Sequence, residues 1–314
     1  MSPPKVSILI PVYNGEPFLT ECLDSVLAQD FTNLEILIAD DDSTDGSVAL
    51  LEQYAAKDRR IRWWKNPHNL GLAGNFNRCL QAAQGEYIKY VLQDDKLLSP
   101  ATVSLMTAAL DSHPTVALVG SASYLLDARS RPTGLRKYFS AGLLAGRRAI
   151  LRCLEQPANM IGEPSVVMFR RARVTGGFDE RYPQGLDLEF WFRLLEKGDH
   201  FFYLTKPLCA FRQHAKQETQ RNRRLSNKKE PLMLLERYYA QSWFRSMMTK
   251  KLLFAQLYSL RRDPEVRAES LYVEMKKNLG PSWYLLYLIR RMLTGPLKKI
   301  GLWIARQSVM SSRA

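Results

Sequence analysis

The sequence of 314 residues lacks a stretch that is long and apolar enough to cross a lipid bilayer. A membrane-spanning helix needs about 20 mostly apolar residues, whereas the apolar run near the N-terminus is short and stops at Pro11. The same run is too short for the hydrophobic segment of a secretory signal peptide. We therefore expect a cytoplasmic protein.

Cysteine is scarce and widely spaced. The four cysteines are Cys22, Cys79, Cys153 and Cys209, and each lies in an apolar or helical context. Zinc sites need closely spaced cysteine pairs, which this spacing does not provide. We expect four reduced thiols in the core.

Two glycine-rich nucleotide signatures are also absent. The turn after the first apolar run reads VYNGEP, which is neither the GxGxxG of a dinucleotide-binding fold nor the start of a P-loop, GxxxxGK[ST]. A nucleotidyltransferase would need a glycine-rich signature with a nearby Lys or Arg at this place, and the turn does not supply it. These three classes of nucleotide-binding enzyme are therefore disfavoured.

Acidic residues are rare in the last third of the chain. Residues 1–220 hold 25 Lys and Arg and 25 Asp and Glu, whereas residues 221–314 hold 20 and 6. The whole net charge of +14 therefore lies in the tail. We predict two domains, a globular domain at 1–220 and a basic helical extension at 221–314, because 46% hydrophobic content is enough for a full core.

The first hundred residues alternate between β-branched apolar runs and helical patterns, which predicts an α/β fold with a mostly parallel sheet and right-handed crossovers. The expected strands are the run from Val6 to Asn14, which Pro11 stops, and Leu34 to Ala39, Ile61 to Lys65 and Tyr87 to Leu92. The expected helices contain Phe18 to Leu27, Ser47 to Ala56 and Asn75 to Ala83, and a fourth begins near Pro100.

Carboxylates follow two of the expected strands. Asp40 and Asp41 come after the second strand, and Asp94 and Asp95 come after the fourth. Open α/β sheets bind ligands at the carboxyl ends of their strands, and Mg²⁺ or Mn²⁺ takes carboxylate and phosphate oxygens. The alternative for Asp94 and Asp95 is a turn that only caps the helix beginning near Pro100. Similarly, Gly71 either allows backbone amides to approach a phosphate or belongs to a plain loop.

These segments resemble family 2 glycosyltransferases with the GT-A fold, of the inverting type that builds bacterial cell-surface glycans. The resemblance rests on motifs in the same order and at comparable spacing, over roughly residues 5 to 220. The motifs are IPVYNG, IADDDSTDGS, NLGLAGNFNRCLQAAQGEYIKYVLQDDKLLSP, NMIGEPSVVMFRR, GGFDERYPQGLDLEFWFRLLEKG and FRQHAKQET.

The resemblance implies a nucleotide-sugar site and a divalent metal, Mn²⁺ or Mg²⁺. Asp95 and His214 are the implied metal ligands, and Leu92 stands where many relatives carry a further Asp. A carboxylate at the base position suits the imide N–H of uracil or thymine. The implied nucleotide-binding residues are Pro11, Tyr13, Asn14, Asp40, Asp41, Asn75 and Asp94.

The resemblance also implies a catalytic base. Matching the family's WxRL helix to Trp191 through Leu194 places Asp187 at the base position and Glu189 as a supporting or capping group. Leu186 replaces the first acid of the usual pair. The alternative is that Asp187 only caps a helix from Leu188 to Lys197. The segment from Asn159 to Ser165 either shapes the acceptor pocket or is a structural loop.

The basic tail has helical patterns at Pro231 to Leu260 and Pro264 to Asn278, followed by PSWYLLYLIRRMLTGPLKKIGLWIARQ. Aromatic and apolar residues beside basic ones suit helices lying on an anionic membrane. The alternative is a basic face on helices that pack against the catalytic domain or a second subunit. No nucleic-acid-binding motif is present, so we expect no nucleic-acid partner.

The sequence thus predicts an inverting, metal-dependent transfer from a UDP- or dTDP-sugar to a glycan acceptor, lipid-linked at the inner face of the cell membrane. The alternative is a non-catalytic nucleotide-sugar-binding or membrane-associated scaffold, since Leu92 and Leu186 replace acids that relatives often carry. The donor sugar and the acceptor do not follow from the sequence, because the loops from Ala122 to Leu144 have no periodic pattern.

Overall fold

The computed structural model describes residues 3–155, 158–215, 217, 230–249, 252, 253, 256, 257, 260, 264–281, 285 and 289. The chain divides into two compact units. The first unit comprises residues 1–153 and 158–231, and the second comprises residues 154–157 and 232–314. Each unit is described by itself.

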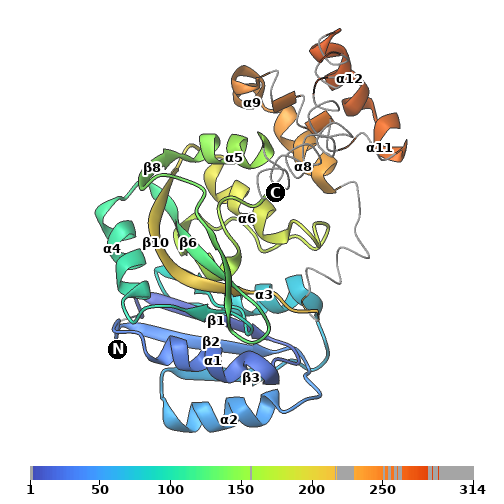
Figure 1. Cartoon of the computed structure of the whole chain (residues 1–314). Helices are drawn as coiled ribbons and strands as arrows, with labels where there is room; N and C mark the ends of the chain where they lie inside the picture. Colours follow the sequence, from blue (N-terminus) through green and yellow to red (C-terminus); the bar gives the residue numbers. More distant parts are fainter. Residues whose placement is uncertain are drawn as a thin grey trace, which may run out of the picture. The chain divides into compact units, whose positions relative to one another are not determined.

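Within the described residues the first unit contains one large sheet (Figure 1). Its strand order is β3-β2-β1-β4-β9-β6-β10-β5, with β7 beside β6 and β8 beside β10. The strands are β1 (Val6–Val12), β2 (Leu34–Asp40), β3 (Ile61–Lys65), β4 (Tyr87–Tyr90), β5 (Lys96–Leu97), β6 (Val116–Leu126), β7 (Pro132–Arg136), β8 (Gly142–Ala145), β9 (Val167–Arg170) and β10 (His200–Arg212).

The first four strands, β3-β2-β1-β4, are all parallel, and β6 pairs in parallel with β10. The remaining pairings, which involve β5, β7, β8 and β9, are antiparallel. The predicted α/β class is therefore confirmed. The helices of this unit are α1 (Glu16–Leu27), α2 (Ser47–Lys57), α3 (Gly71–Ala82), α4 (Thr102–Ser112), α5 (Gly146–Glu155) and α6 (Leu186–Leu195), with 3-10 turns at Pro164–Val166 and Arg171–Arg173.

Helices cover both faces of the sheet, which is why every residue of β1 and β2 is buried. On one face the alternate residues of β1 and β2 pack with apolar residues of α1, α2 and α4 in a single core. On the other face α3 packs on β1 and β2, and an aromatic cluster joins α3, β4, β9 and α6. All four cysteines are buried and free, as predicted.

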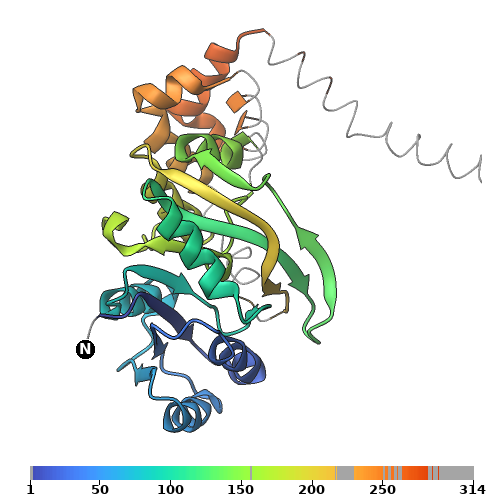
Figure 2. The same ribbon diagram turned by 90° about the vertical axis from the view of Figure 1, so that its left-hand side faces the viewer.

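The region from Ala122 to Leu144 is not the set of loops that the sequence suggested. Strand β6 continues to Leu126, and β7 and β8 follow it. Figure 2 shows β7 (green) along the border of the sheet. Both β7 and β8 are largely exposed or half-buried, so their residues lack the alternation of apolar and polar side chains by which a half-buried strand is recognised.

Two helices begin earlier than predicted. Helix α3 begins at Gly71 instead of Asn75, because the Asp41 carboxylate accepts the N–H groups of Leu70 and Gly71. Helix α6 begins at Leu186, with Gly185 as its N-cap residue. Asp187 therefore lies inside the first turn and is not the N-cap that one interpretation of the sequence proposed.

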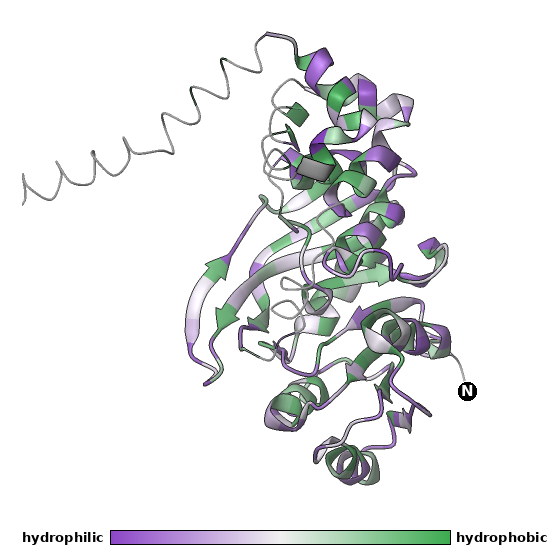
Figure 3. Cartoon of the chain, turned by 90° about the vertical axis from the view of Figure 1, so that its right-hand side faces the viewer, coloured by the Kyte–Doolittle hydropathy of each residue, from purple (hydrophilic) through white to green (hydrophobic). Residues whose placement is uncertain are grey.

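The second unit is helical where it is described. It contains most of α8 (Glu230–Tyr239), with α9 (Ser242–Met247), α11 (Pro264–Ala268) and α12 (Ser270–Leu279). Hydrophobic and hydrophilic residues are interspersed along these helices (Figure 3), and Tyr238, Phe244 and Met275 are buried. Across the described part of the chain, none of the helices has the length and apolar character needed to span a membrane. The predicted interfacial stretch after Gly280 lies almost entirely outside the described residues.

Candidate active site

The carboxyl end of β2 delivers two buried acids. Asp40 is fully buried, and its Oδ2 accepts the backbone N–H of Ser43 at 3.0 Å. Its other oxygen, Oδ1, is buried without a hydrogen-bond partner among the described residues. An unpaired buried acceptor is costly, so Asp40 retains an unused capacity to accept a hydrogen bond beside the end of β1.

Asp41 is held differently. Its Oδ1 accepts the side-chain amide of Asn66 and the N–H of Leu70, both at 2.8 Å, and its Oδ2 accepts the N–H of Gly71 at 3.0 Å. Asp41 therefore fixes the glycine-rich turn and the start of α3. Gly71 itself has a φ of +74°, a conformation that residues with a Cβ rarely adopt.

Asn75 also holds backbone. Its amide donates to the carbonyl of Ala39 at 3.0 Å and to that of Val12 at 3.4 Å, and its oxygen accepts from Asn66 at 3.0 Å. The side-chain amide of Asn75, which was predicted to bind the nucleotide, thus ties the ends of β1 and β2 together.

Tyr13 and Asn14 directly follow β1. Within β1, Pro11 pairs with Ala39 of β2. The backbone of Tyr13 makes two hydrogen bonds with the side chain of Gln93, at 2.7 and 2.9 Å, and the side chain of Tyr13 is 43% exposed. Asn14 has a φ of 50° and accepts the N–H of Thr44 at 2.9 Å. The exposed ring of Tyr13 is thus held near the loop that carries Asp94.

Strand β4 ends at Tyr90, two residues before the predicted end, because the N–H of Leu92 turns to the Ser165 hydroxyl at 2.9 Å. Asp95 is buried, and its Oδ1 accepts the backbone N–H of Arg212 at 2.9 Å. Its Oδ2 has no hydrogen-bond partner among the described residues. Burial and the adjacent Asp94 carboxylate raise the pKa of Asp95 well above its usual range.

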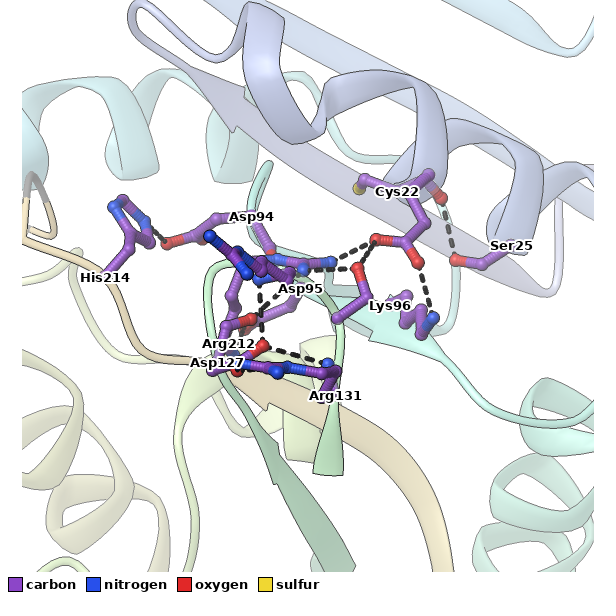
Figure 4. A network of polar contacts seen from close by, with 12 residues as sticks. Cys22, Ser25, Asp94, Asp95, Lys96, Asp127, Arg131, Arg212 and His214 are labelled. Carbon is purple, nitrogen blue, oxygen red and sulfur yellow. Dashed lines mark hydrogen bonds and ion pairs between the residues drawn. The ribbon is translucent and has the colours of Figure 1, made fainter. Parts of the chain in front are cut away.

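A polar network surrounds this acidic pair (Figure 4). The Arg212 side chain is buried; it donates to the Asp94 carbonyl and the Ser130 hydroxyl, both at 2.7 Å, and pairs with Glu21. His214 Nε2 lies 2.9 Å from Asp94 Oδ2. The sequence analysis missed Arg212 and Glu21, although Arg212 lies two residues before His214 in a quoted motif.

The acids after β4 fit a divalent cation in their chemistry. Asp95 carries an unpaired buried oxygen, and Asp94 and His214 add a carboxylate and an imidazole beside it. A buried carboxylate whose pKa is raised, as that of Asp95 is, is stabilised in its charged form by a cation of charge +2. Among the described residues, however, no group of three or more His, Cys, Asp or Glu side chains is arranged to hold a metal ion. Oxygens of a bound diphosphate would therefore have to complete the coordination.

Asp187 is positioned by α6 and by the preceding loop at 159–163. Its Oδ2 accepts the side-chain amide of Asn159 at 2.7 Å, and its Oδ1 accepts the N–H of Leu188 at 2.8 Å. Burial, and then the nearby Glu163 carboxylate, raise the pKa of Asp187 to about 7. A carboxylate with this pKa is suited to accept a proton near neutral pH.

Glu163 connects the two acidic sites. Its charge contributes to the raised pKa of Asp187 and to that of Asp95. Its neighbours in the chain make the contacts: Asn159 binds Asp187, and the Ser165 hydroxyl binds the N–H of Leu92. Glu163 is itself paired with Arg136 of β7. The sequence analysis included Glu163 only as part of a loop and missed Arg136, because β7 was not predicted.

Glu189 has a different surrounding from Asp187. It is buried and binds Arg193 through both oxygens, at 2.8 and 3.0 Å. Arg193 also donates to the carbonyls of Thr175 and Gly177. Through Arg193, Glu189 therefore anchors the loop that precedes α6.

The chain is similar in sequence to known glycosyltransferases. The family model described as "Glycosyl transferase family 2" matches residues 7–174. A Bacillus subtilis protein named "Putative glycosyltransferase EpsE" is 32% identical over 221 residues, covering 68% of this chain and 74% of the relative. The "GalNAc(5)-diNAcBac-PP-undecaprenol beta-1,3-glucosyltransferase" of Campylobacter jejuni is 34% identical over 114 residues, covering 36% of this chain and 37% of that protein.

Two solved structures share the fold. S. aureus TarS 1-349 in complex with UDP-GlcNAc aligns with a TM-score of 0.56 and 18% identity, covering 95% of this chain and 75% of that one. The mannosyltransferase PcManGT from Pyrobaculum calidifontis, in complex with GDP-Man and Mn²⁺, aligns with a TM-score of 0.56 and 17% identity, covering 98% and 85%.

Proposed function

The chain belongs to glycosyl transferase family 2 and is a glycosyltransferase, and from this premise we propose that it transfers a sugar from a UDP- or dTDP-sugar to a glycan acceptor by an inverting single displacement. One observation carries the proposal. The segment from Asn159 to Ser165 contacts both acidic regions: Asn159 binds Asp187, whose pKa is about 7, and Ser165 binds the N–H of Leu92, three residues before Asp95 with its unpaired oxygen. A proton acceptor and a cation-binding acid are thus available in the same part of the first unit.

In this mechanism Asp187 takes the proton of an acceptor hydroxyl as the hydroxyl oxygen attacks the anomeric carbon. Asn159 and the N–H of Leu188 orient the carboxylate for that step. The bond from the anomeric carbon to the diphosphate oxygen breaks as the new bond forms on the opposite side, so the configuration inverts. The leaving group is the nucleoside diphosphate.

On the donor side, Asp40 would accept the imide N–H of the base through its unpaired oxygen. Tyr13, with its exposed ring, and the neighbouring Pro11 and Asn14 would line the base. Asp95, with Asp94 and His214, would hold Mn²⁺ or Mg²⁺. That ion, when bound, supplies Lewis-acid stabilisation of the charge that develops on the diphosphate.

We further propose that the acceptor is lipid-linked and that the protein works at the cytoplasmic face of the membrane. The Campylobacter relative is named for an undecaprenol-linked substrate, and the net charge of +14 lies after residue 220. Basic amphipathic helices favour anionic lipid surfaces. In this proposal the first unit carries the reaction, and the basic residues after it bring it to the membrane.

The experiment that tests the donor site is a thermal-shift screen of UDP, dTDP, GDP and CMP, each with and without Mn²⁺, on the purified protein. We expect UDP or dTDP to raise the Tm only when Mn²⁺ is present. A response to GDP alone would change the base assignment. If none of the nucleotides shifts the Tm of the folded protein, the alternative of a non-catalytic scaffold is favoured instead.

A further inference from the structure

The start of helix α6 is held from outside the helix. Its N-cap residue, Gly185, has no side chain with which to bind the N–H groups at the helix start. Such groups need acceptors, and a helix start left without them is destabilised. Since Asp187 lies in the first turn of α6, whatever fixes this turn also fixes the proposed base.

Glu230 supplies an acceptor for the N-cap residue and for the residue before it. Its Oε2 accepts the backbone N–H of Gln184 and that of Gly185, each at 3.0 Å. The Glu230 side chain is buried, with only 4% of the residue exposed. An anionic oxygen that accepts two N–H groups at the N-terminus of a helix makes charge-assisted hydrogen bonds and also interacts favourably with the helix dipole.

The same arrangement occurs at α3, where Asp41 accepts the N–H groups of Leu70 and Gly71. There the distant carboxylate coincides with a helix that begins a full turn earlier than its own sequence predicts. At α6 the helix likewise begins at Leu186, two residues before the predicted start. In both cases a remote carboxylate holds the backbone at or just before the helix start.

We propose that Glu230 is a positioning residue for glycosyl transfer: it caps α6 through Gln184 and Gly185 and thereby sets the place from which Asp187 reaches the acceptor. The inference rests on the proposed role of Asp187. Glu230 lies after the family match, which ends at residue 174, and after the predicted domain boundary at 220. The catalytic unit therefore extends at least to Glu230.

The cap is tested by amide hydrogen exchange on the full-length chain. Exchange at residues 184–188 is compared in the wild type, Glu230→Ala, Glu230→Gln and the control Glu236→Gln, which changes an exposed carboxylate on the same helix. We expect exchange at these residues to be fastest in Glu230→Ala, intermediate in Glu230→Gln, and unchanged in the control. Unchanged exchange in both Glu230 variants would overturn the proposal.

The positioning role is tested by the release of UDP from UDP-GlcNAc and UDP-glucose in Mn²⁺, with water as acceptor. We expect kcat to fall about 10- to 100-fold in Glu230→Ala, as for a misplaced catalytic group, and less in Glu230→Gln, with the KM for the donor unchanged. Faster exchange with an unchanged kcat would overturn the positioning role.

Failure of the proposed function gives a different result. If the wild type releases no UDP and binds no nucleotide, the function proposed for the chain is wrong. The exchange experiment still decides in that case whether Glu230 caps α6. Glu230→Gln, which keeps the shape of the side chain, guards against a loss of folding in Glu230→Ala.

Discussion

Two aspartates of the candidate site have different surroundings. Asp41 lies on the donor side, the part of the site proposed to bind the nucleotide-sugar, and Asp187 lies on the acceptor side, the part proposed to bind the acceptor. On the donor side, Asp41 accepts three N–H groups and serves to hold the turn before α3. On the acceptor side, Asp187 accepts two N–H groups and has Glu163 as a neighbour, which together with burial raises its pKa to about 7. The surroundings make Asp41 an anchor and give Asp187 a pKa that suits the proton acceptor we propose.

The largest expected effect comes from removing the proton acceptor. Asp187→Asn keeps the shape of the side chain but cannot take the acceptor's proton, so we expect kcat to fall by a factor of about 100 to 10,000. Donor affinity should stay as in the wild type, because the donor side is built from β1, β2 and β4. Both quantities are measured from UDP release and from nucleotide titration.

The control for this variant is Glu180→Gln, which removes an exposed carboxylate from the loop that precedes α6. It should leave kcat and donor affinity unchanged. If Asp187→Asn weakens donor binding as much as it lowers kcat, Asp187 supports the fold of the site and the distinction between the two sides does not hold.

A second prediction concerns the donor side. Asp95→Asn still accepts the N–H of Arg212 but loses the negative charge, so Mn²⁺-dependent binding of UDP should weaken by about 10- to 100-fold. The measurement is the rise in Tm with UDP and Mn²⁺, which requires no turnover. UDP binding measured without Mn²⁺ should change much less.

Asp42→Asn is the matched control for Asp95→Asn. Asp42 is an aspartate that follows β2; it is half-buried and paired with Lys65, and Asn tolerates its φ of 64°. This variant should respond to UDP and Mn²⁺ like the wild type. Equal responses of Asp95→Asn and the wild type would remove Asp95 from the proposed metal site.

The positions of the donor-side acids, at the carboxyl ends of β2 and β4, were largely predictable from the sequence for a physical reason. Parallel strands place their carboxyl ends on one edge of the sheet, so the acids after residues 39 and 93 could be brought together without knowledge of any side-chain contact. The second and third strands were predicted to within one residue of their observed ends. The glycine-rich turn was recognised, but the start of α3 was not, because it depends on Asp41.

The acceptor side was less predictable, because its contacts join residues that are far apart in the sequence. Asp187 itself was found by resemblance, but its partner Asn159 lies 28 residues away and Glu230 binds Gly185 from 45 residues away. Arg212 meets Glu21 across 191 residues. A local pattern contains no information on such pairs, and the partly exposed strand β7, which carries Arg136, has no clear period.

The smallest expected effect is a change of thermal stability with pH, which tests the raised pKa of Asp187. The folded pKa of Asp187, about 7, lies above the ordinary value of 3.8, so the folded state binds a proton more tightly than the unfolded state. The contribution of this group to stability is then fully present below about pH 4 and is lost as the pH rises toward 7.

Asp187→Asn cannot ionise, so the Tm of the variant minus that of the wild type should increase between pH 4.5 and 8, by an amount on the order of several degrees. Any cost of placing the Asn amide beside Asn159 is the same at every pH, so it does not affect how the Tm difference changes with pH. Glu180→Gln should show no such change. Parallel Tm curves for Asp187→Asn and the wild type would mean that Asp187 ionises as easily in the folded protein as in the unfolded chain, and the contrast with the donor side would then be one of geometry alone.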